Sequence, residues 1–170
     1  GLCVGNEARG RLENITISRN ERVGLSVRGS AQVSLLDCTV ESNGTDEFND
    51  GGISVGDEAR LTLRNCTVSD NVGYGLYDAK GEAQVRLENS TLSENKEGLA
   101  VYYRTQVSLE DCTINGNELD GLSVGGKARI NLENSTISDN GENGLFVGDS
   151  SGSEAVAIIT GGEISGNGKA

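Results

Sequence analysis

Short runs of alternating apolar and polar residues recur along the whole chain and end in turns rich in Asn and Gly. The string LENSTISDNGENGLFV at 132–147 has a close counterpart, LENSTLSENKEGLAV, at 87–101. Seven units open on a glycine followed by Leu or Ile, most of them 23 residues apart: Gly1, Gly24, Gly52, Gly75, Gly98, Gly121 and Gly144. A repeat of this length predicts stacked structural units within one domain.

Each unit contains three short runs with a period of two residues, which is typical of β-strands. In the second unit Leu25 and Val27, then Val33 and Leu35, and finally Val40 are expected to face inward, while polar residues alternate with them. One unit cannot cover this apolar face, but stacked coils bury it as a continuous column. The sequence therefore predicts an all-β solenoid over residues 1–170, with seven coils of about 23 residues and three strands each.

Asn and Asp recur at two fixed positions in the unit. One set follows the third strand: Asn20, Asn43, Asn71, Asn95, Asn117, Asn140 and Asn167. The other separates the second strand from the third: Asn14, Asp37, Asn65, Asn89, Asp111 and Asn134. Because Asn and Asp tolerate left-handed backbone and stacked amides bond to one another, we expect two corner ladders, with left-handed backbone at residues such as Asn95 and Asn117.

The pattern I-x-x-N followed by G-[LI]-x-V resembles the repeats of right-handed parallel β-helices. These occur in pectate-lyase-like and epimerase-like enzymes, copper-accessory proteins and many surface proteins, and the resemblance covers all 170 residues. It implies a scaffold whose enzymes place Asp clusters, Ca²⁺-binding carboxylates with an Arg or Lys base, or a His motif on one sheet. A leucine-rich repeat is the main alternative, but the segment GLSVGGKARIN at 121–131 is broken by glycines and β-like rather than helical.

Candidate catalytic groups are sparse. The chain has no His, which excludes His-based epimerase or hydrolase motifs, and it contains no Asp-Asp pair of the polygalacturonase-like kind. The turn GTDEFND at 44–50 groups Asp46, Glu47 and Asp50, whose oxygens could bind Ca²⁺. A solvated acidic loop is the competing interpretation, because the spacing of a known Ca²⁺ loop is lacking. We expect no other cofactor.

Charge and hydropathy narrow the possible partners. The net charge of −12 disfavours binding to nucleic acid or to an anionic membrane surface. No apolar stretch approaches the length of a membrane span, and the first residues, GLCVGNEARG, lack an initiator Met and a signal region. We therefore expect a segment of a longer repeat protein. An extracellular or cell-surface location follows from the family resemblance alone.

The tyrosines mark a departure from the repeat. All four lie in coils four and five or in the turn entering them: Tyr74, Tyr77, Tyr102 and Tyr103. Aromatic faces beside charged groups suit sugars, so we expect Tyr77 and Tyr102 to point outward from equivalent strands with Tyr103 and Arg104 at the edge.

Charged residues complete this candidate ligand site. Asp78 takes the place of the usual core Val, and Lys80 lies close by in the sequence. The alternative is that Asp78 begins a turn shifted by a one-residue insertion and that the tyrosines cover a Gly-rich flank.

Two further rows of residues, one of threonines and one of cysteines, lead to structural predictions. Six threonines should stack outward on the third strands in an array similar to the ice-binding face of some β-solenoids: Thr16, Thr39, Thr67, Thr91, Thr113 and Thr136. Glu41, Asn115 and Glu163 interrupt this region, and Thr is also an ordinary choice for an exposed strand. Cys38, Cys66 and Cys112 share an inward position, where we expect free thiols.

These observations favour a non-catalytic β-helix module that acts as a rigid structural or adhesive scaffold toward a polysaccharide or cell-surface component. The main alternative is a carbohydrate-binding or carbohydrate-processing domain of the lyase or epimerase kind, and ice binding is a minor one. The first and last coils should expose unpaired strand edges, which would permit end-to-end self-association.

Overall fold

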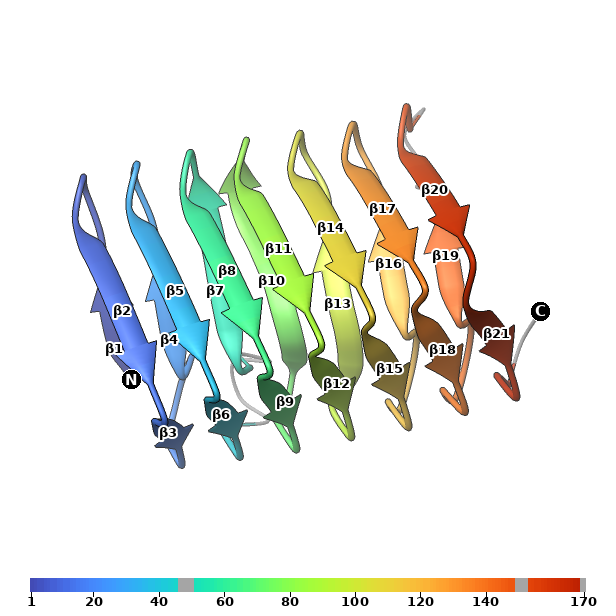
Figure 1. The fold of residues 1–170 in the computed structure, drawn as a ribbon, viewed down its shortest axis with the longest axis horizontal. Helices are drawn as coiled ribbons and strands as arrows, with labels where there is room; N and C mark the ends of the chain where they lie inside the picture. The colour runs from blue at the N-terminus through green and yellow to red at the C-terminus, as the bar shows by residue number, and fades with distance from the viewer. Residues whose placement is uncertain (46–50, 149–152, 169–170) are drawn as a thin grey trace.

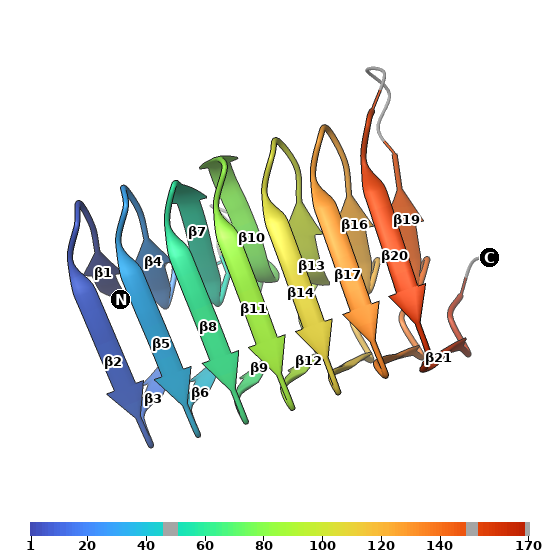
Figure 2. The same ribbon diagram turned by 45° about the horizontal axis from the view of Figure 1, so that its top comes forward.

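Seven coils stack into a solenoid, with the N-terminus at one end and the C-terminus at the other (Figure 1). The computed structural model describes residues 1–45, 51–148 and 153–168. Within these ranges each coil contributes one strand to each of three parallel sheets. Figure 2, turned by 45°, shows the strands of successive coils side by side in the same order. The predicted all-β architecture of seven coils is confirmed.

The strands fall into three sheets, numbered in chain order. The first sheet contains β1 (Leu2–Val4), β4 (Leu25–Val27), β7 (Ile53–Asp57), β10 (Tyr74–Gly81), β13 (Glu97–Val101), β16 (Leu122–Val124) and β19 (Leu145–Val147). The second sheet contains β2 (Arg9–Glu13), β5 (Gln32–Leu36), β8 (Arg60–Arg64), β11 (Gln84–Glu88), β14 (Gln106–Glu110), β17 (Arg129–Glu133) and β20 (Val156–Thr160). The third sheet contains β3 (Thr16–Ser18), β6 (Thr39–Glu41), β9 (Thr67–Ser69), β12 (Thr91–Ser93), β15 (Thr113–Asn115), β18 (Thr136–Ser138) and β21 (Glu163–Ser165).

Aliphatic residues of the three sheets meet in one continuous core. Leu25 and Val27 of the first sheet are fully buried, as are their counterparts in the next coils. The in-register pairing of parallel strands places like residues above one another, for example Leu87 between Leu63 and Leu109. The predicted inward residues are therefore confirmed, and burial of these columns is the main stabilising contribution.

The inner corner after the third sheet holds a ladder of asparagine amides. Each Nδ2 donates to Oδ1 of the Asn in the next coil, at 2.8–3.3 Å from Asn20 through to Asn167. Each Oδ1 also accepts a backbone N–H from the preceding coil, as between Asn71 and Asn95 at 3.1 Å. The predicted amide ladder is confirmed at this corner.

Left-handed backbone lies beside this ladder and not within it. Asn95 and Asn117 lack the positive φ that the sequence predicted; the residues before them, Glu94 with φ 53° and Gly116 with φ 64°, adopt it instead. This part of the prediction is wrong because an amide that bonds along the stack must point inward, so the residue before it makes the bend. At the other corner the Asn and Asp residues do have positive φ, between 47° and 54°: Asn14, Asp37, Asn65, Asn89, Asp111 and Asn134.

The glycine that opens each unit is explained by close packing. A Cβ at Gly75 would lie 2.6 Å from the carbonyl oxygen of Gly98 and 2.9 Å from Nδ2 of Asn95. No side chain fits there without displacing the next coil or the ladder. The described residues include no helix long and apolar enough to cross a membrane.

Candidate functional site

The regular stack is broken where β10 passes β7. Asp78 pairs with Val55, and the register then shifts by one residue before Lys80 pairs with Gly56. Asp78 therefore lies within β10 at the core position, only 5% exposed, and does not begin a turn as one interpretation of the sequence proposed. The inserted residue forms a β-bulge, which increases local twist and disrupts the ladder at that point.

The Asp78 carboxylate substitutes for a backbone acceptor. In other coils, the N–H that follows the first sheet donates to the carbonyl of the core Val one coil earlier: Arg28 to Val4 at 3.0 Å, Gly125 to Val101 at 2.9 Å and Gly148 to Val124 at 2.9 Å. In coil five the equivalent donor, Tyr102 N–H, bonds Oδ2 of Asp78 at 2.9 Å. The carboxylate thus satisfies a donor whose usual partner is displaced by the bulge.

Thr105 faces this carboxylate from the next coil. It is fully buried, at a position where four other coils have a fully buried alanine: Ala31, Ala59, Ala83 and Ala128. Burial raises the pKa of Asp78, whereas the Thr105 hydroxyl and the Tyr102 N–H lower it. Neither Oδ1 of Asp78 nor Oγ1 of Thr105 makes a hydrogen bond of normal geometry with a described residue.

The tyrosines separate into two pairs. Tyr77 pairs in register with Ala100, and its ring lies 5.4 Å from that of Tyr74, centre to centre. Tyr102 follows the end of β13 and enters the turn with Tyr103. The expectation that Tyr77 and Tyr102 occupy equivalent strand positions is therefore wrong, because Tyr77 is the second residue after the opening glycine Gly75, whereas Tyr102 is the fourth residue after Gly98.

Tyr102 and Tyr103 line a hollow of about 630 Å³ on the turns between the first and second sheets. We call it the tyrosine–cation groove; its residues are Lys80, Gly81, Glu82, Tyr102, Tyr103, Arg104, Gly126 and Lys127. Three cations and one carboxylate line it, in a chain whose net charge is −12. Arg104 bonds Glu82 at 3.0 Å and Lys127 bonds Glu154 at 3.1 Å, while Lys80 has no ion pair with a described residue.

Backbone geometry at Tyr103 is unusual for its residue type. Its φ is +47°, in the left-handed region. The corresponding turn residues in three other coils are Asn6, Gly29 and Gly126, which suit this conformation. A bulky residue there is an outlier, and such strain is concentrated at functional sites. The ring is held exposed on the groove at a cost that this turn avoids in those three coils.

The phenol of Tyr102 is influenced by nearby acidic groups. Burial raises the pKa of Tyr102 to about 12, and the charge of Glu97 adds to the effect. Burial likewise raises the pKa of the Glu97 carboxyl, with Ser123 acting in the opposite direction and Asp120 in the same one. Asp120 accepts hydrogen bonds from Asn143 N–H and Nδ2 at 2.8 Å, which join two successive coils beside this cluster.

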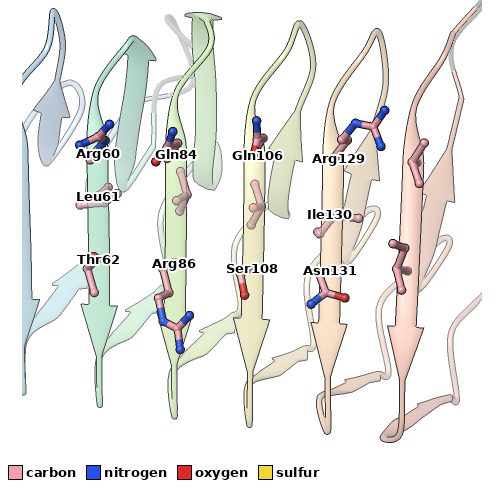
Figure 3. Close-up of a pocket in the computed structure, with 14 residues that line it drawn as sticks. Arg60, Leu61, Thr62, Gln84, Arg86, Gln106, Ser108, Arg129, Ile130 and Asn131 are labelled. Carbon is pink, nitrogen blue, oxygen red and sulfur yellow. The ribbon is translucent and has the colours of Figure 1, made fainter.

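A second hollow, of about 470 Å³, crosses the outer face of the second sheet. Figure 3 shows Arg60, Gln84, Gln106 and Arg129 in one row over successive strands. The neighbouring rows carry ion pairs, including Arg86 with Glu110 at 2.8 Å and Arg64 with Glu88 at 2.7 Å. The two arginines are 50–57% exposed, as expected for a solvated face, and such pairs contribute little to stability.

The third sheet carries the threonine array. Six threonines stand in register on consecutive coils, followed by Glu163: Thr16, Thr39, Thr67, Thr91, Thr113 and Thr136. The array is thus in the predicted place. All four cysteines are free, with Cys3 exposed and Cys38, Cys66 and Cys112 buried as predicted.

The proposed Ca²⁺ ligands cannot be placed, because Asp46, Glu47 and Asp50 lie outside the described residues. Within the described ranges, no three His, Cys, Asp or Glu side chains gather in a way that could hold a metal ion.

The repeat and the three parallel sheets are those of a known protein family. The family model for a right-handed β-helix region matches residues 1–92 and again residues 78–170. The chain belongs to this right-handed β-helix family. Its fold is similar to the crystal structure of the pectate lyase Pel9A, with a TM-score of 0.64 and 15% sequence identity. All of this chain is covered but only 52% of that one, so the chain spans about half the length of the enzyme and the likeness concerns the fold alone. No curated protein matches the sequence.

Sequence reasoning missed two residues of this β-helix region. Lys127 joins the tyrosine–cation groove because its N–H bonds the Tyr103 carbonyl at 2.6 Å, a contact set by coil stacking. Thr105 was overlooked although the signal was present, since it stands where the repeat otherwise has Ala. Of the predicted site residues, the groove unites Tyr102, Tyr103 and Arg104; Tyr77 lies outside its lining and Asp78 is buried beneath.

Proposed function

We propose that the chain is a non-catalytic β-helix module that serves as a rigid scaffold in an extracellular or cell-surface protein. The observation that carries this proposal is the amide ladder, which continues without a break from Asn20 to Asn167 beside a fully buried aliphatic core. Contacts that repeat from coil to coil resist bending, as a spacer requires. The outer location rests on the likeness of the repeats to those of surface proteins.

Two measurements test the scaffold. Hydrogen exchange should show strong, similar protection of the inward-facing strands in coils two to six, as expected for one cooperative rod. Acidic and neutral polysaccharides should remain intact during incubation with the protein and Ca²⁺. Cleavage or epimerisation of any of them by the purified chain would overturn the non-catalytic assignment, and retention of a tagged full-length protein inside the cell would overturn the location.

A second function, saccharide binding, is favoured by the tyrosine–cation groove. Exposed Tyr102 and Tyr103 offer apolar ring faces, and Lys80 and Arg104 supply hydrogen-bond donors beside them. This combination suits the apolar faces and hydroxyl groups of a sugar. The strained backbone at Tyr103 supports a role for that ring beyond the fold.

Calorimetric titration with a panel of oligosaccharides tests the groove. An aromatic contact contributes about 0.5–1.5 kcal/mol, so Tyr102→Ala should weaken binding roughly two- to twelvefold. Tyr77→Ala is the matched control, since Tyr77 belongs to coil four but does not line the groove. Wild-type binding that is unaffected by Tyr102→Ala, or no binding to any member of the panel, would remove the groove as a saccharide site.

A further inference from the structure

Asp78 and Thr105 are two polar departures from the aliphatic core that face each other across successive coils. Asp78 pairs with Val55 of the preceding coil, and Thr105 stands where four other coils have a buried alanine. Asp78 is only 5% exposed and Thr105 is fully buried. The Thr105 hydroxyl also lowers the pKa of Asp78, so the two groups lie close together. Polar groups placed this deep in a core require a polar partner.

Three oxygen atoms gather here without the partner that their surroundings would normally supply. Oδ1 of Asp78 and Oγ1 of Thr105 are buried and make no hydrogen bond of normal geometry with a described residue. The main-chain carbonyl of Asp78 loses the donor that its counterparts have, because Tyr102 N–H bonds Oδ2 at 2.9 Å instead. Buried oxygens of this kind are normally bonded to protein, to water or to an ion.

The carboxylate charge of Asp78 is not balanced by a cation in the described part of the chain. The pKa of Asp78 is raised by burial and lowered by the Thr105 hydroxyl and the Tyr102 N–H, with no charged side chain among its causes. Lys80 lies two residues further on, but it lines the tyrosine–cation groove. Buried charges are generally paired or bound to a metal ion, so the site calls for one positive charge.

We propose that a monovalent metal cation, of the Na⁺ or K⁺ kind, is bound between Asp78 and Thr105. Asp78 Oδ1, the Asp78 carbonyl and Thr105 Oγ1 supply hard oxygen ligands, and a single positive charge neutralises the single carboxylate. Ca²⁺ takes about six to eight oxygens and Mg²⁺ retains several waters, which do not suit a buried site with one carboxylate. The proposal rests on the fold and is independent of the saccharide groove.

A proton competes with the cation for the same oxygen. Protonated Asp78 is neutral and can donate its hydrogen to Thr105, so only the ionised carboxylate binds the cation. Binding should therefore strengthen as pH rises, and added cation should lower the pH at which Asp78 titrates. A bridging water carries no charge and shows neither effect.

Thermal unfolding at pH 8 in sodium, potassium or tetramethylammonium chloride of equal ionic strength tests the site. Tetramethylammonium carries the same charge but is too bulky for a site in the core. At ten times its dissociation constant, a bound cation raises the ratio of folded to unfolded protein about elevenfold, which corresponds to a melting temperature roughly 3–6 °C above that in the tetramethylammonium salt. Asp78→Asn and Thr105→Ala should each lose most of this rise. Thr105→Ala restores the residue of four other coils, so it keeps the test open if Asp78→Asn folds poorly.

Ser54→Ala is the matched control. Its Oγ is also buried without a bonded partner, but Ser54 lies on the outward row of β7 between two core residues, whereas Asp78 points inward. This variant should keep the full response to the cation. Carbon-13 NMR of the Asp78 carboxyl provides a second readout, because the midpoint of its titration should fall by about one pH unit at ten times the dissociation constant.

Three results would overturn the proposal. Equal melting temperatures of the wild type in the three salts would exclude a bound cation and leave a proton or a water as the partner. A rise that Asp78→Asn and Thr105→Ala share fully with the wild type would show that cations act on the surface of a chain whose net charge is −12. An Asp78 titration that is the same in all three salts would remove the carboxylate as a ligand.

Discussion

The backbone N–H of Tyr102 donates to the carboxylate of Asp78, 2.9 Å away, where other coils use a main-chain carbonyl. A charged group at a core position is thereby explained by the geometry of the bulge in β10. An uncompensated carboxylate at this depth would be strongly destabilising, so the bond accounts for the presence of an acid among valines.

Asp78→Asn should remove a pH dependence of stability. Burial raises the pKa of Asp78 in the folded state above its ordinary value of 3.8, so the ionised form is disfavoured by folding. The contribution of Asp78 is therefore most favourable below that ordinary value and is lost as pH rises through the raised one, by about 1.4 kcal/mol for each pKa unit of the shift. Denaturant unfolding between pH 3 and pH 8 should show that the free energy of unfolding of Asp78→Asn rises relative to that of the wild type as pH increases.

Thr105→Ala provides the check on that assignment. The Thr105 hydroxyl lowers the pKa of Asp78, so its removal should move the loss of stability to higher pH. A stability difference between Asp78→Asn and the wild type that does not change with pH would contradict burial of the carboxyl as its cause.

Tyr103→Gly should stabilise the protein. A left-handed conformation costs a residue with a side chain about 1–2 kcal/mol, although the greater freedom of glycine in the unfolded chain offsets part of that gain. We expect a rise in melting temperature of roughly 2–4 °C for about 1 kcal/mol. Tyr77→Gly, the same exchange within β10, should lower the melting temperature. Equal shifts in one direction would refute the strain at Tyr103.

Asn95→Leu should be severely destabilising. Its Nδ2 bonds the Val68 carbonyl at 3.0 Å and the Ser93 carbonyl at 2.9 Å, and its Oδ1 accepts from Asn71. Several buried groups would lose partners, at about 1–3 kcal/mol each, so we expect at least about 3 kcal/mol in denaturant unfolding.

Two substitutions close to Asn95 distinguish the contribution of the amide ladder from that of the left-handed bend beside it. Thr91→Val on the outer face should change the free energy of unfolding by less than about 0.5 kcal/mol. Glu94→Gly should be neutral or stabilising, because Glu94 has the left-handed φ of 53° that glycine adopts readily. If Glu94→Gly were as damaging as Asn95→Leu, the division of roles at this corner would be wrong.

Thiol reactivity should follow burial. Cys3 is exposed, whereas Cys66 and Cys112 are buried, and burial raises the pKa of both thiols. At pH 8 a thiol reagent should label one cysteine of the native protein rapidly and the other three only after unfolding. Fast labelling of a Cys3→Ser variant would contradict the tight packing of this column.

The sequence by itself determined the coil. Inward Leu, Ile and Val at a period of two, an amide after each third strand and a glycine at each opening recur seven times, and each feature depends on contacts with an identical neighbour one coil away. Because every coil meets the same surroundings, local pattern and tertiary packing agree, and the inward residues from Leu25 to Ile137 were predictable.

The tertiary structure decided what happens where the repeat is broken. The sequence did not specify on which side of Asp78 the additional residue of coil four is accommodated. The bulge after Asp78 keeps Tyr77 opposite Ala100 and Asp78 opposite Val55. It also left open which of two adjacent corner residues turns inward, as with Glu94 and Asn95. Such choices depend on hydrogen bonds and packing across neighbouring coils, which no single unit encodes, so the groove of Tyr102, Tyr103, Arg104 and Lys127 emerges only when the coils are stacked.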